Sequence, residues 1–207
     1  EIKGVTIQTL DSDPVEGGGS WASGPAINTA RFQAAGAGAT QSASYIVGGA
    51  IPGTSPNLSA LHEQFDGSSW TEAGDLGTAR YGLGTFGTPS AALASGGYSG
   101  SYTNSTENWN GSSWTAGTAM GTTRAYFGAS GTSTAGLVYG GLNPGVSLAY
   151  VNQTEKWNGS AWTETGDLNT RRRAGGQSQN GTQTAAIYSG GETPSKTAVT
   201  EQFDGTS

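Results

Sequence analysis

The stretch Glu155-Lys-Trp-Asn-Gly-Ser-Ala-Trp162 holds the pattern that decides the fold, and an Arg follows ten residues after its last Trp, at Arg172. A Gly-Gly pair and another Glu-x-aromatic box come next along the chain. These four marks recur four times: Trp21, Trp70, Trp114 and Trp162; Arg31, Arg80, Arg124 and Arg172; diglycines at Gly48, Gly96, Gly140 and Gly190; and boxes at Glu63, Glu107, Glu155 and Glu201. Self-similarity at intervals of 44 to 49 residues predicts an array of equal units, and this period is typical of propeller blades.

Each unit divides into four short strands. A stretch rich in Gly and Ala follows each Arg and fits the crowded innermost strand, where backbones approach closely. These stretches span 32–39, 81–87, 126–131 and 173–180. A short apolar run that ends in the diglycine predicts a second, buried strand. An Asn-Gly or Asp-Gly pair between the box and the Trp is a strong hairpin signal, so the outer two strands form a hairpin. No window shows helical periodicity. We therefore predict an all-β propeller of four-stranded antiparallel blades, with four blades in this chain.

The repeat covers residues 19–207, which we interpret as one propeller domain, preceded by an extended arm or linker at residues 1–18. The first Trp strand, at Trp21, has no box before it, and the last box, around Phe203, has no Trp after it. The two ends are complementary, so the phase of the repeat predicts a ring closed by the N-terminal outer strand. Two alternatives stay open: the piece belongs to a larger propeller, or several chains share one ring.

The order diglycine, Glu-x-aromatic-Asp, Trp and Arg resembles the kelch repeat over roughly residues 19–207. That resemblance implies a propeller of four-stranded blades, although the hairpin from the aromatic to the Trp is shorter than the usual kelch spacing. The surrounding composition, rich in Gly, Ser, Thr and Ala, includes Asn-Gly-Ser-x-Trp and Leu-Asn-Thr-Arg. In this it is similar to kelch-like proteins of marine tailed phages, including cyanophages, which are usually virion or tail-associated.

Composition excludes several chemistries. The chain has no Cys, one His and a net charge of −6. Some kelch propellers are copper radical oxidases, which need a Cys cross-linked to a Tyr together with His ligands, so that activity is excluded. A lone His62 offers no metal site, and we expect it at the surface beside its box. The acidic charge argues against nucleic acid, and no apolar stretch reaches the length of a membrane span. We therefore expect no cofactor, no metal, no nucleic-acid partner and no membrane insertion.

The repeated Trp, Arg and Glu residues are interpreted as scaffold. A side chain that occurs once per unit at a fixed offset is expected to serve packing or a repeated bond, such as a bidentate Arg-Glu pair or a bond to a neighbouring blade's carbonyls. The alternative is an anion-binding mouth lined by the four Arg residues. Arg171, Arg172 and Arg173 form the one dense basic spot, which a solvated strand start explains about as well as an anionic ligand does.

The loops between the diglycine and the box are where the units differ, with offsets of 14, 10, 14 and 10 residues. Variable loops on a repeated scaffold usually carry binding, and Tyr and Pro give contact area at low entropic cost. Tolerance of loops to change is the competing explanation. The candidate binding residues are Pro52, Pro56, Tyr98, Tyr102, Pro144, Tyr150 and Pro194.

These features lead us to expect a non-enzymatic structural or adhesive module of a phage particle, associated with a tail, fibre or capsid. Its expected partners are other virion proteins, copies of itself, or host-surface glycans. A secreted or cell-surface carbohydrate-binding propeller of the lectin type is the alternative. A glycan-active enzyme is a third possibility, because a propeller can bring distant carboxylates together, but nothing nominates a catalytic pair.

Overall fold

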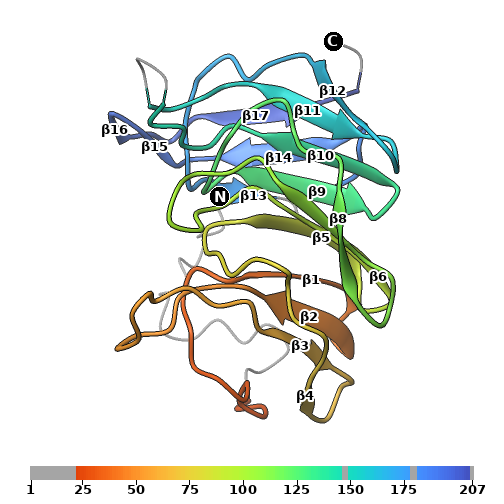
Figure 1. Ribbon diagram of the computed structural model, residues 1–207. Helices are drawn as coiled ribbons and strands as arrows, with labels where there is room; N and C mark the ends of the chain where they lie inside the picture. The colour runs from red at the N-terminus through yellow and green to blue at the C-terminus, as the bar shows by residue number, and fades with distance from the viewer. Residues whose placement is uncertain (1–21, 146–148, 178–180, 206–207) are drawn as a thin grey trace, which may run out of the picture.

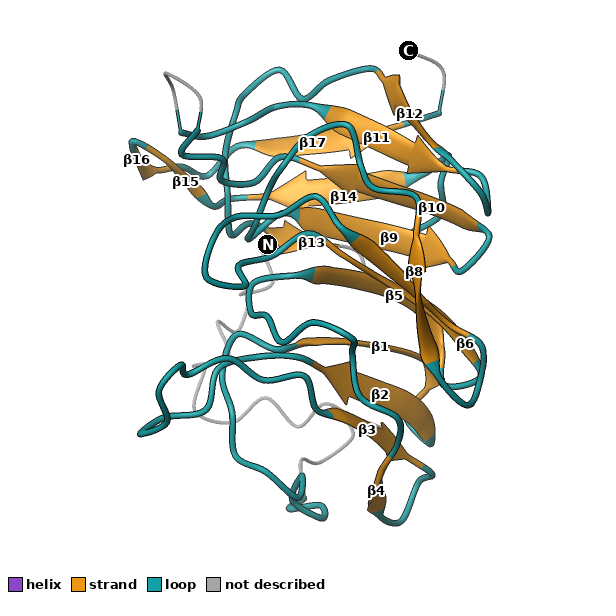
Figure 2. Cartoon of the chain, in the orientation of Figure 1, coloured by secondary structure: helices purple, strands orange, loops and turns teal. Residues whose placement is uncertain are grey.

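The computed structural model of the protein describes residues 22–145, 149–177 and 181–205. Within these ranges the chain forms strands and no helix, so it holds no helix long and apolar enough to cross a membrane. Four groups of antiparallel strands succeed one another as the blades of a propeller (Figure 1). Figure 2 shows strands joined by loops and turns throughout. The predicted all-β propeller is confirmed.

The strands fall into four blades in chain order. Blade 1 contains β1 (Ala35–Thr40), β2 (Ala43–Val47), β3 (His62–Phe65) and β4 (Trp70–Glu72). Blade 2 contains β5 (Gly84–Thr88), β6 (Ala91–Ser95), β7 (Thr106–Trp109) and β8 (Trp114–Gly117). Blade 3 contains β9 (Gly128–Thr132), β10 (Ala135–Tyr139), β11 (Thr154–Trp157) and β12 (Trp162–Thr165). Blade 4 contains β13 (Gly176–Gln177), β14 (Ala186–Ser189) and β17 (Thr200–Phe203), with a separate hairpin of β15 (Glu192–Thr193) and β16 (Ser195–Lys196).

Strand pairing in blades 1 to 3 follows chain order from the innermost strand outward. The box aromatic lies opposite the repeat Trp in each of these blades, as Trp157 does opposite Trp162. Blade 4 differs because its described sheet has three strands, β13, β14 and β17. The strand expected beside β17 begins at Trp21, which lies outside the described residues, as does the expected arm at 1–18. Closure of the ring by that strand stays a prediction.

Hydrophobic clusters lie between neighbouring blades rather than within each blade. Each cluster joins the second strand of one blade to the sheet of the next, so a blade buries its apolar face only against its neighbour. The buried members are Tyr45, Val47, Leu76, Leu83, Ala92, Ala94, Trp109 and Trp114 between blades 1 and 2; Phe86, Leu93, Met120, Phe127, Ala129, Val138 and Trp157 between blades 2 and 3; and Leu137, Tyr139, Ala186 and Tyr188 between blades 3 and 4.

The diglycines join adjacent blades. The N–H of the second Gly donates to the carbonyl of the next blade's repeat Arg, as in the 2.9 Å bond from Gly97 to Arg124. The first Gly has a left-handed backbone, and a Cβ on Gly96 would lie 2.6 Å from that same Arg124 carbonyl. Only Gly fits such a position without strain. Equivalent bonds run from Gly49 to Arg80 and from Gly141 to Arg172, each at 2.8 Å.

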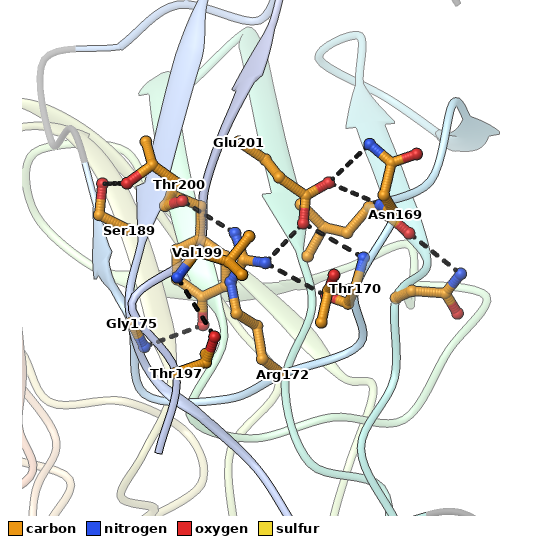
Figure 3. A network of polar contacts seen from close by, with 12 residues as sticks. Asn169, Thr170, Arg172, Gly175, Ser189, Thr197, Val199, Thr200 and Glu201 are labelled. Atoms are coloured by element: carbon orange, nitrogen blue, oxygen red, sulfur yellow. Dashed lines mark hydrogen bonds and ion pairs between the residues drawn. The ribbon is translucent and has the colours of Figure 1, made fainter. Parts of the chain in front are cut away.

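Each repeat Arg forms an ion pair with the Glu of its own blade, at 2.5 to 2.7 Å. All four Arg side chains have 0% exposure, so no ligand reaches them. Figure 3 shows the blade 4 pair, in which Glu201 lies between Arg172 and the backbone of Asn169 and Thr170. The pairs are Arg31–Glu63, Arg80–Glu107, Arg124–Glu155 and Arg172–Glu201.

The geometry of these pairs differs from the bidentate pair expected. One guanidinium nitrogen contacts the carboxylate, and the other donates to backbone carbonyls, as Nη2 of Arg172 does to Tyr188 at 2.8 Å. The second carboxylate oxygen accepts a backbone N–H from the turn that leads into the blade, such as Gly77 on Glu107 at 2.6 Å. The Glu thus fixes both the Arg and the chain before it, which a bidentate pair would not do.

The expectation of a surface His62 is wrong. Its exposure is 0%, and its ring makes edge contacts with Tyr45, Trp109 and Trp114. The indole N–H of Trp114 donates to Nδ1 of His62 at 3.2 Å. In the next blade Trp162 donates in the same way to Oγ1 of a Thr, at 3.2 Å. His62 therefore takes the place of the repeat Thr as the acceptor for the following blade's Trp.

Replacing His62 with Thr is expected to remove part of the acid sensitivity of folding. Burial lowers the pKa of His62 to about 4; the contact with the Gly74 carbonyl and nearby Asp75 oppose the shift, and Arg31 adds to it. The unfolded chain binds the proton near pH 6.5, so this contribution is complete above about pH 6.5 and is lost as the pH falls toward 4. We expect roughly 3 kcal/mol of loss across that window in the native chain, at about 1.4 kcal/mol per unit.

The measurement is urea denaturation of both proteins at about pH 7.5 and about pH 4.5. Exposed Asp66, whose pKa is lowered to about 2 by hydrogen bonds from Ser69 and Ser68, titrates below this window in both proteins. Parallel stability profiles for the native chain and His62→Thr would contradict the assignment.

Candidate functional site

The loops between the second and third strands of all four blades project from one side of the propeller, on the left in Figure 1. Each loop starts from an antiparallel bridge between the residue after the repeat Arg and the residue after the diglycine. The bridges are Phe32–Ala50, Tyr81–Tyr98, Ala125–Leu142 and Arg173–Glu192. The scaffold thus presents four variable pairs from four equivalent positions on one face, as binding loops on a rigid fold require.

A chain of backbone hydrogen bonds joins the blades on this face. The position two residues after each repeat Arg is left-handed, at Gln33, Gly82, Tyr126 and Ala174. Three bonds link these positions in order: Gly82 to the Gln33 carbonyl at 3.0 Å, Tyr126 to Gly82 at 2.8 Å, and Ala174 to Tyr126 at 2.8 Å. A left-handed backbone costs a non-Gly residue about 1–2 kcal/mol, and such strain persists where the surroundings enforce it. The chain of bonds therefore holds Tyr126 in place.

Five tyrosines gather around this chain, and we call them the tyrosine face: Tyr81, Tyr98, Tyr102, Tyr126 and Tyr150. The rings of Tyr81 and Tyr98 stack at 5.2 Å, and Tyr102 meets Tyr98 edge-on at 5.2 Å. Tyr126 lies 6.4 Å from Tyr81. All five side chains are half-buried, so each ring is supported by the protein and still presents area to solvent.

Arg173 joins Tyr150 to this group. Its guanidinium lies 5.7 Å from the ring centre of Tyr126 and 5.6 Å from that of Tyr150, both within cation–π range. Glu192 accepts from Arg173 at 3.0 Å and from the Tyr150 hydroxyl at 3.1 Å. These bonds lower the pKa of Glu192, which stays ionised beside the rings. The face therefore combines aromatic area with a fixed cation and a fixed carboxylate.

Burial raises the pKa of both Tyr102 and Tyr126, so their hydroxyls stay protonated across the physiological range. The Tyr126 hydroxyl donates to Oε1 of Gln33 at 3.5 Å and so reaches from blade 3 to blade 1. A Cβ on Gly82 would lie 2.9 Å from the Tyr126 ring, which shows how closely the ring covers blade 2. Tyr126 therefore contacts Gln33 of blade 1, Tyr81 of blade 2 and Arg173 of blade 4.

No protein-family model matches this chain, and no curated protein matches it.

The structure brings together three of the seven predicted loop residues, Tyr98, Tyr102 and Tyr150. The four prolines are exposed, and within the described ranges none of the ring and polar contacts of the tyrosine face involves them. They are Pro52, Pro56, Pro144 and Pro194.

The basic spot separates into three environments. Arg171 is exposed, Arg172 is buried against Glu201, and Arg173 pairs with Glu192 on the tyrosine face. Two of the three charges are therefore neutralised by carboxylates, and the stretch does not present a basic patch. Anion binding by all three Arg residues is excluded by this arrangement.

Tyr81, Tyr126, Arg173 and Glu192 were not among the sequence-predicted loop candidates. Each lies one or two residues after a repeat Arg or directly after a diglycine, next to repeat residues that the sequence analysis interprets as scaffold. The sequence signal that identifies them is a residue that differs from blade to blade at a fixed distance from the repeat Arg or the diglycine. The residue after the repeat Arg is Phe32, Tyr81, Ala125 or Arg173, although the Arg before it recurs in every unit.

Two further features bear on chemistry. In the described part of the chain, no three His, Cys, Asp or Glu side chains group as a metal site would require. A cavity of about 510 Å³ lies at the inner-strand hairpins of all four blades, and its lining is Gly, Ala, Thr and Gln with no charged side chain. Neither feature gathers acids, bases or nucleophiles. The tyrosine face is the arrangement best suited to contact a ligand.

Proposed function

We propose that this propeller is a non-enzymatic structural and adhesive module of a phage particle, carried on a tail, fibre or capsid, that contacts host-surface glycan through the tyrosine face. One observation carries the proposal: five half-buried tyrosines form a cluster in which Tyr126 and Tyr150 contact an Arg–Glu pair, on the side where the variable loops emerge. The sequence resemblance to kelch-like phage proteins supports the setting, and the geometry supports the contact.

Glycan suits this surface on chemical grounds. A pyranose ring has an apolar face of C–H groups that packs on an aromatic ring, while its hydroxyl groups need donors and acceptors in fixed positions. Arg173 supplies donors, and Glu192 supplies acceptors within the same cluster. Tyrosine loses little conformational entropy on binding, and the contacts between rings restrict these side chains before a ligand arrives.

Tyr126→Ala is expected to weaken glycan binding about tenfold or more, because stacking on one aromatic ring contributes about 1–3 kcal/mol in related ring-stacking systems. Alanine suits this backbone, since Ala174 holds the same left-handed conformation in blade 4. The measurement is a glycan array with the isolated chain, followed by calorimetric titration of the best ligand. Tyr126→Phe keeps the ring and should keep most of the affinity.

Arg173→Ala tests the polar part of the face, and Arg171→Ala is its matched control. Both remove one Arg from the same stretch, but Arg171 is exposed and Arg173 contacts the rings. Equal losses in the two variants would mean general charge attraction. Absence of glycan binding by the native chain would overturn the adhesive part of the proposal. Stable incorporation into purified particles, measured by mass spectrometry, would then support assembly with other virion proteins or copies of itself.

The alternative is a secreted or cell-surface lectin-like propeller, which the same tyrosine face would serve. The two proposals predict the same array result and differ in location. Presence of the chain in purified phage particles supports the first, and its presence on a cell surface without particles supports the second.

A further inference from the structure

Phe32 is the most exposed large apolar side chain in the described part of the chain, at 47%. We propose that it is a second aromatic contact beside the tyrosine face, and that the ligand is an extended linear glycan. Such a ligand is several sugar residues long and lies across Gln33, from Phe32 to Tyr126. This inference rests on the proposed function, because it names the class of glycan that the same side of the propeller binds.

Phe32 holds the same position in blade 1 as two members of the proposed site hold in their own blades. It directly follows the repeat Arg, as Tyr81 does in blade 2 and Arg173 does in blade 4. Each of these three residues forms the bridge from which the variable loop of its blade starts. The fold therefore places Phe32 on the side from which the variable loops emerge.

Hydrogen bonds fix the backbone at Phe32. Its N–H donates to the Ala50 carbonyl at 3.0 Å, and its own carbonyl accepts from the Ala50 N–H at 2.7 Å. Gln33, the next residue, has a left-handed backbone, and its carbonyl accepts from the N–H of Gly82 at 3.0 Å. An aromatic ring on a backbone held in this way loses little conformational entropy when a ligand covers it.

Phe32 belongs to a row of three apolar residues, which we call the apolar row. Antiparallel bridges join Phe32 to Ala50 and Ala50 to Leu58, and residues directly opposite one another in such bridges lie on one face. Ala50 is buried and Leu58 is half-buried. One exposed apolar residue needs no ligand to explain it, but a row of them beside a proposed site extends that site. The equivalent row of blade 2 consists of Tyr81, Tyr98 and Tyr102.

Gln33 connects the apolar row to the tyrosine face. Its side chain is exposed, and its Oε1 accepts from the Tyr126 hydroxyl at 3.5 Å. A ligand that contacts both Phe32 and Tyr126 therefore passes over an amide group, which can donate to and accept from sugar hydroxyls.

The extent of this surface favours a chain of sugars over a single sugar. Three successive ring contacts lead from Tyr102 through Tyr98 and Tyr81 to Tyr126, with ring centres 5.2 to 6.4 Å apart, and Phe32 adds a further ring in blade 1. One pyranose ring cannot stack on all of these rings. Each residue of a linear glycan again presents a C–H face and hydroxyl groups, so one chain can make the aromatic and the polar contacts in turn.

Calorimetric titration with oligosaccharides of increasing length tests this proposal. The probes are linear oligomers of glucose, galactose and N-acetylglucosamine, each compared with its own monosaccharide. Affinity should rise with length until the chain reaches Phe32. Phe32→Ala should lower the affinity for the longest oligomer about tenfold, the effect of losing one stacked ring, and change that for the shortest ligand less than about twofold. Alanine fits this position, because Ala125 holds it in blade 3.

Two control variants accompany this measurement. Phe32→Tyr keeps an aromatic ring and should keep the dependence of affinity on length. Ile187→Ala removes another exposed apolar side chain, 37% exposed on β14 of blade 4, and should change neither affinity.

The outcomes separate this inference from the proposed function. Affinity that does not depend on length, or equal losses for short and long ligands in Phe32→Ala, would overturn the extended glycan and leave glycan contact by the tyrosine face in place. Absence of binding at every length would overturn the proposed function and this inference with it. Self-association of the native chain that Phe32→Ala abolishes, measured by analytical ultracentrifugation, would assign Phe32 to a contact between copies and overturn its role in glycan binding.

Discussion

Replacing Glu155 with Ala is expected to lower the free energy of unfolding by about 3–5 kcal/mol, because it leaves the buried guanidinium of Arg124 without a partner charge. The Arg124 side chain has 0% exposure, and its Nη2 lies 2.7 Å from Oε1 of Glu155. Burial lowers the pKa of Arg124, and Glu155 is the principal group that opposes this shift. The substitution also removes the acceptor for the backbone N–H groups of Gly121 and Thr122.

The measurement is equilibrium denaturation in urea, with Glu164→Ala as the matched control. Glu164 lies opposite Glu155 in the β11–β12 pair but is exposed, so its loss should change stability by less than about 0.5 kcal/mol. The double variant Arg124→Met with Glu155→Ala should recover part of the loss, since no unpaired charge remains buried. Similar losses for Glu155→Ala and Glu164→Ala would contradict the importance of the buried pair.

The ion pair also shows which parts of the fold can be predicted from the sequence. The Arg and Glu partners are predictable because both recur at fixed offsets, and a residue repeated in every blade meets the same neighbours in every blade. The Asn-Gly and Asp-Gly hairpins are equally predictable, because the residues of a two-residue turn determine its conformation. The geometry of the ion pair is not predictable in this way. Backbone carbonyls of residues about thirty positions away, such as Gln153, accept hydrogen bonds from Arg124, and this prevents a bidentate pair with the Glu.

Position in the repeat also explains the failure at His62. Considered alone, an ionisable side chain beside a Glu belongs at the surface. Aligned with the other blades, it stands where Thr106 accepts a hydrogen bond from the next blade's indole. The need for a buried acceptor, rather than the polarity of the residue, decides its place.

The loop candidates predicted from sequence include part of the tyrosine face: the structure places Tyr98, Tyr102 and Tyr150 on it. They do not include Tyr126, and the sequence analysis considers Arg173 only as part of the basic spot. The places of both residues depend on contacts across blades: Tyr126 reaches Gln33 across 93 residues of sequence. The repeat shows which positions of different blades are equivalent, but it does not show which side chains of different blades contact one another.

Gly96→Ala is expected to cost about 2–5 kcal/mol, because two penalties add at the first Gly of this diglycine. The φ of +59° costs an L-residue about 1–2 kcal/mol. A Cβ would also lie 2.6 Å from the Arg124 carbonyl and 2.7 Å from Cε1 of Phe127. Relieving such overlap in a packed core costs about 1–3 kcal/mol. Both contacts belong to blade 3, so the second penalty falls on the interface between blades.

Gly100→Ala separates the two penalties. Gly100 also has a positive φ, of +103°, but a Cβ there meets nothing within 4 Å. Its substitution should show only the backbone cost, about 1–2 kcal/mol. The difference between the two variants in urea denaturation therefore measures the docking of blade 2 on blade 3. If Gly96→Ala and Gly100→Ala lose equal stability, the diglycine is needed for its backbone conformation alone, and the close approach of the Arg carbonyl does not hold the blades together.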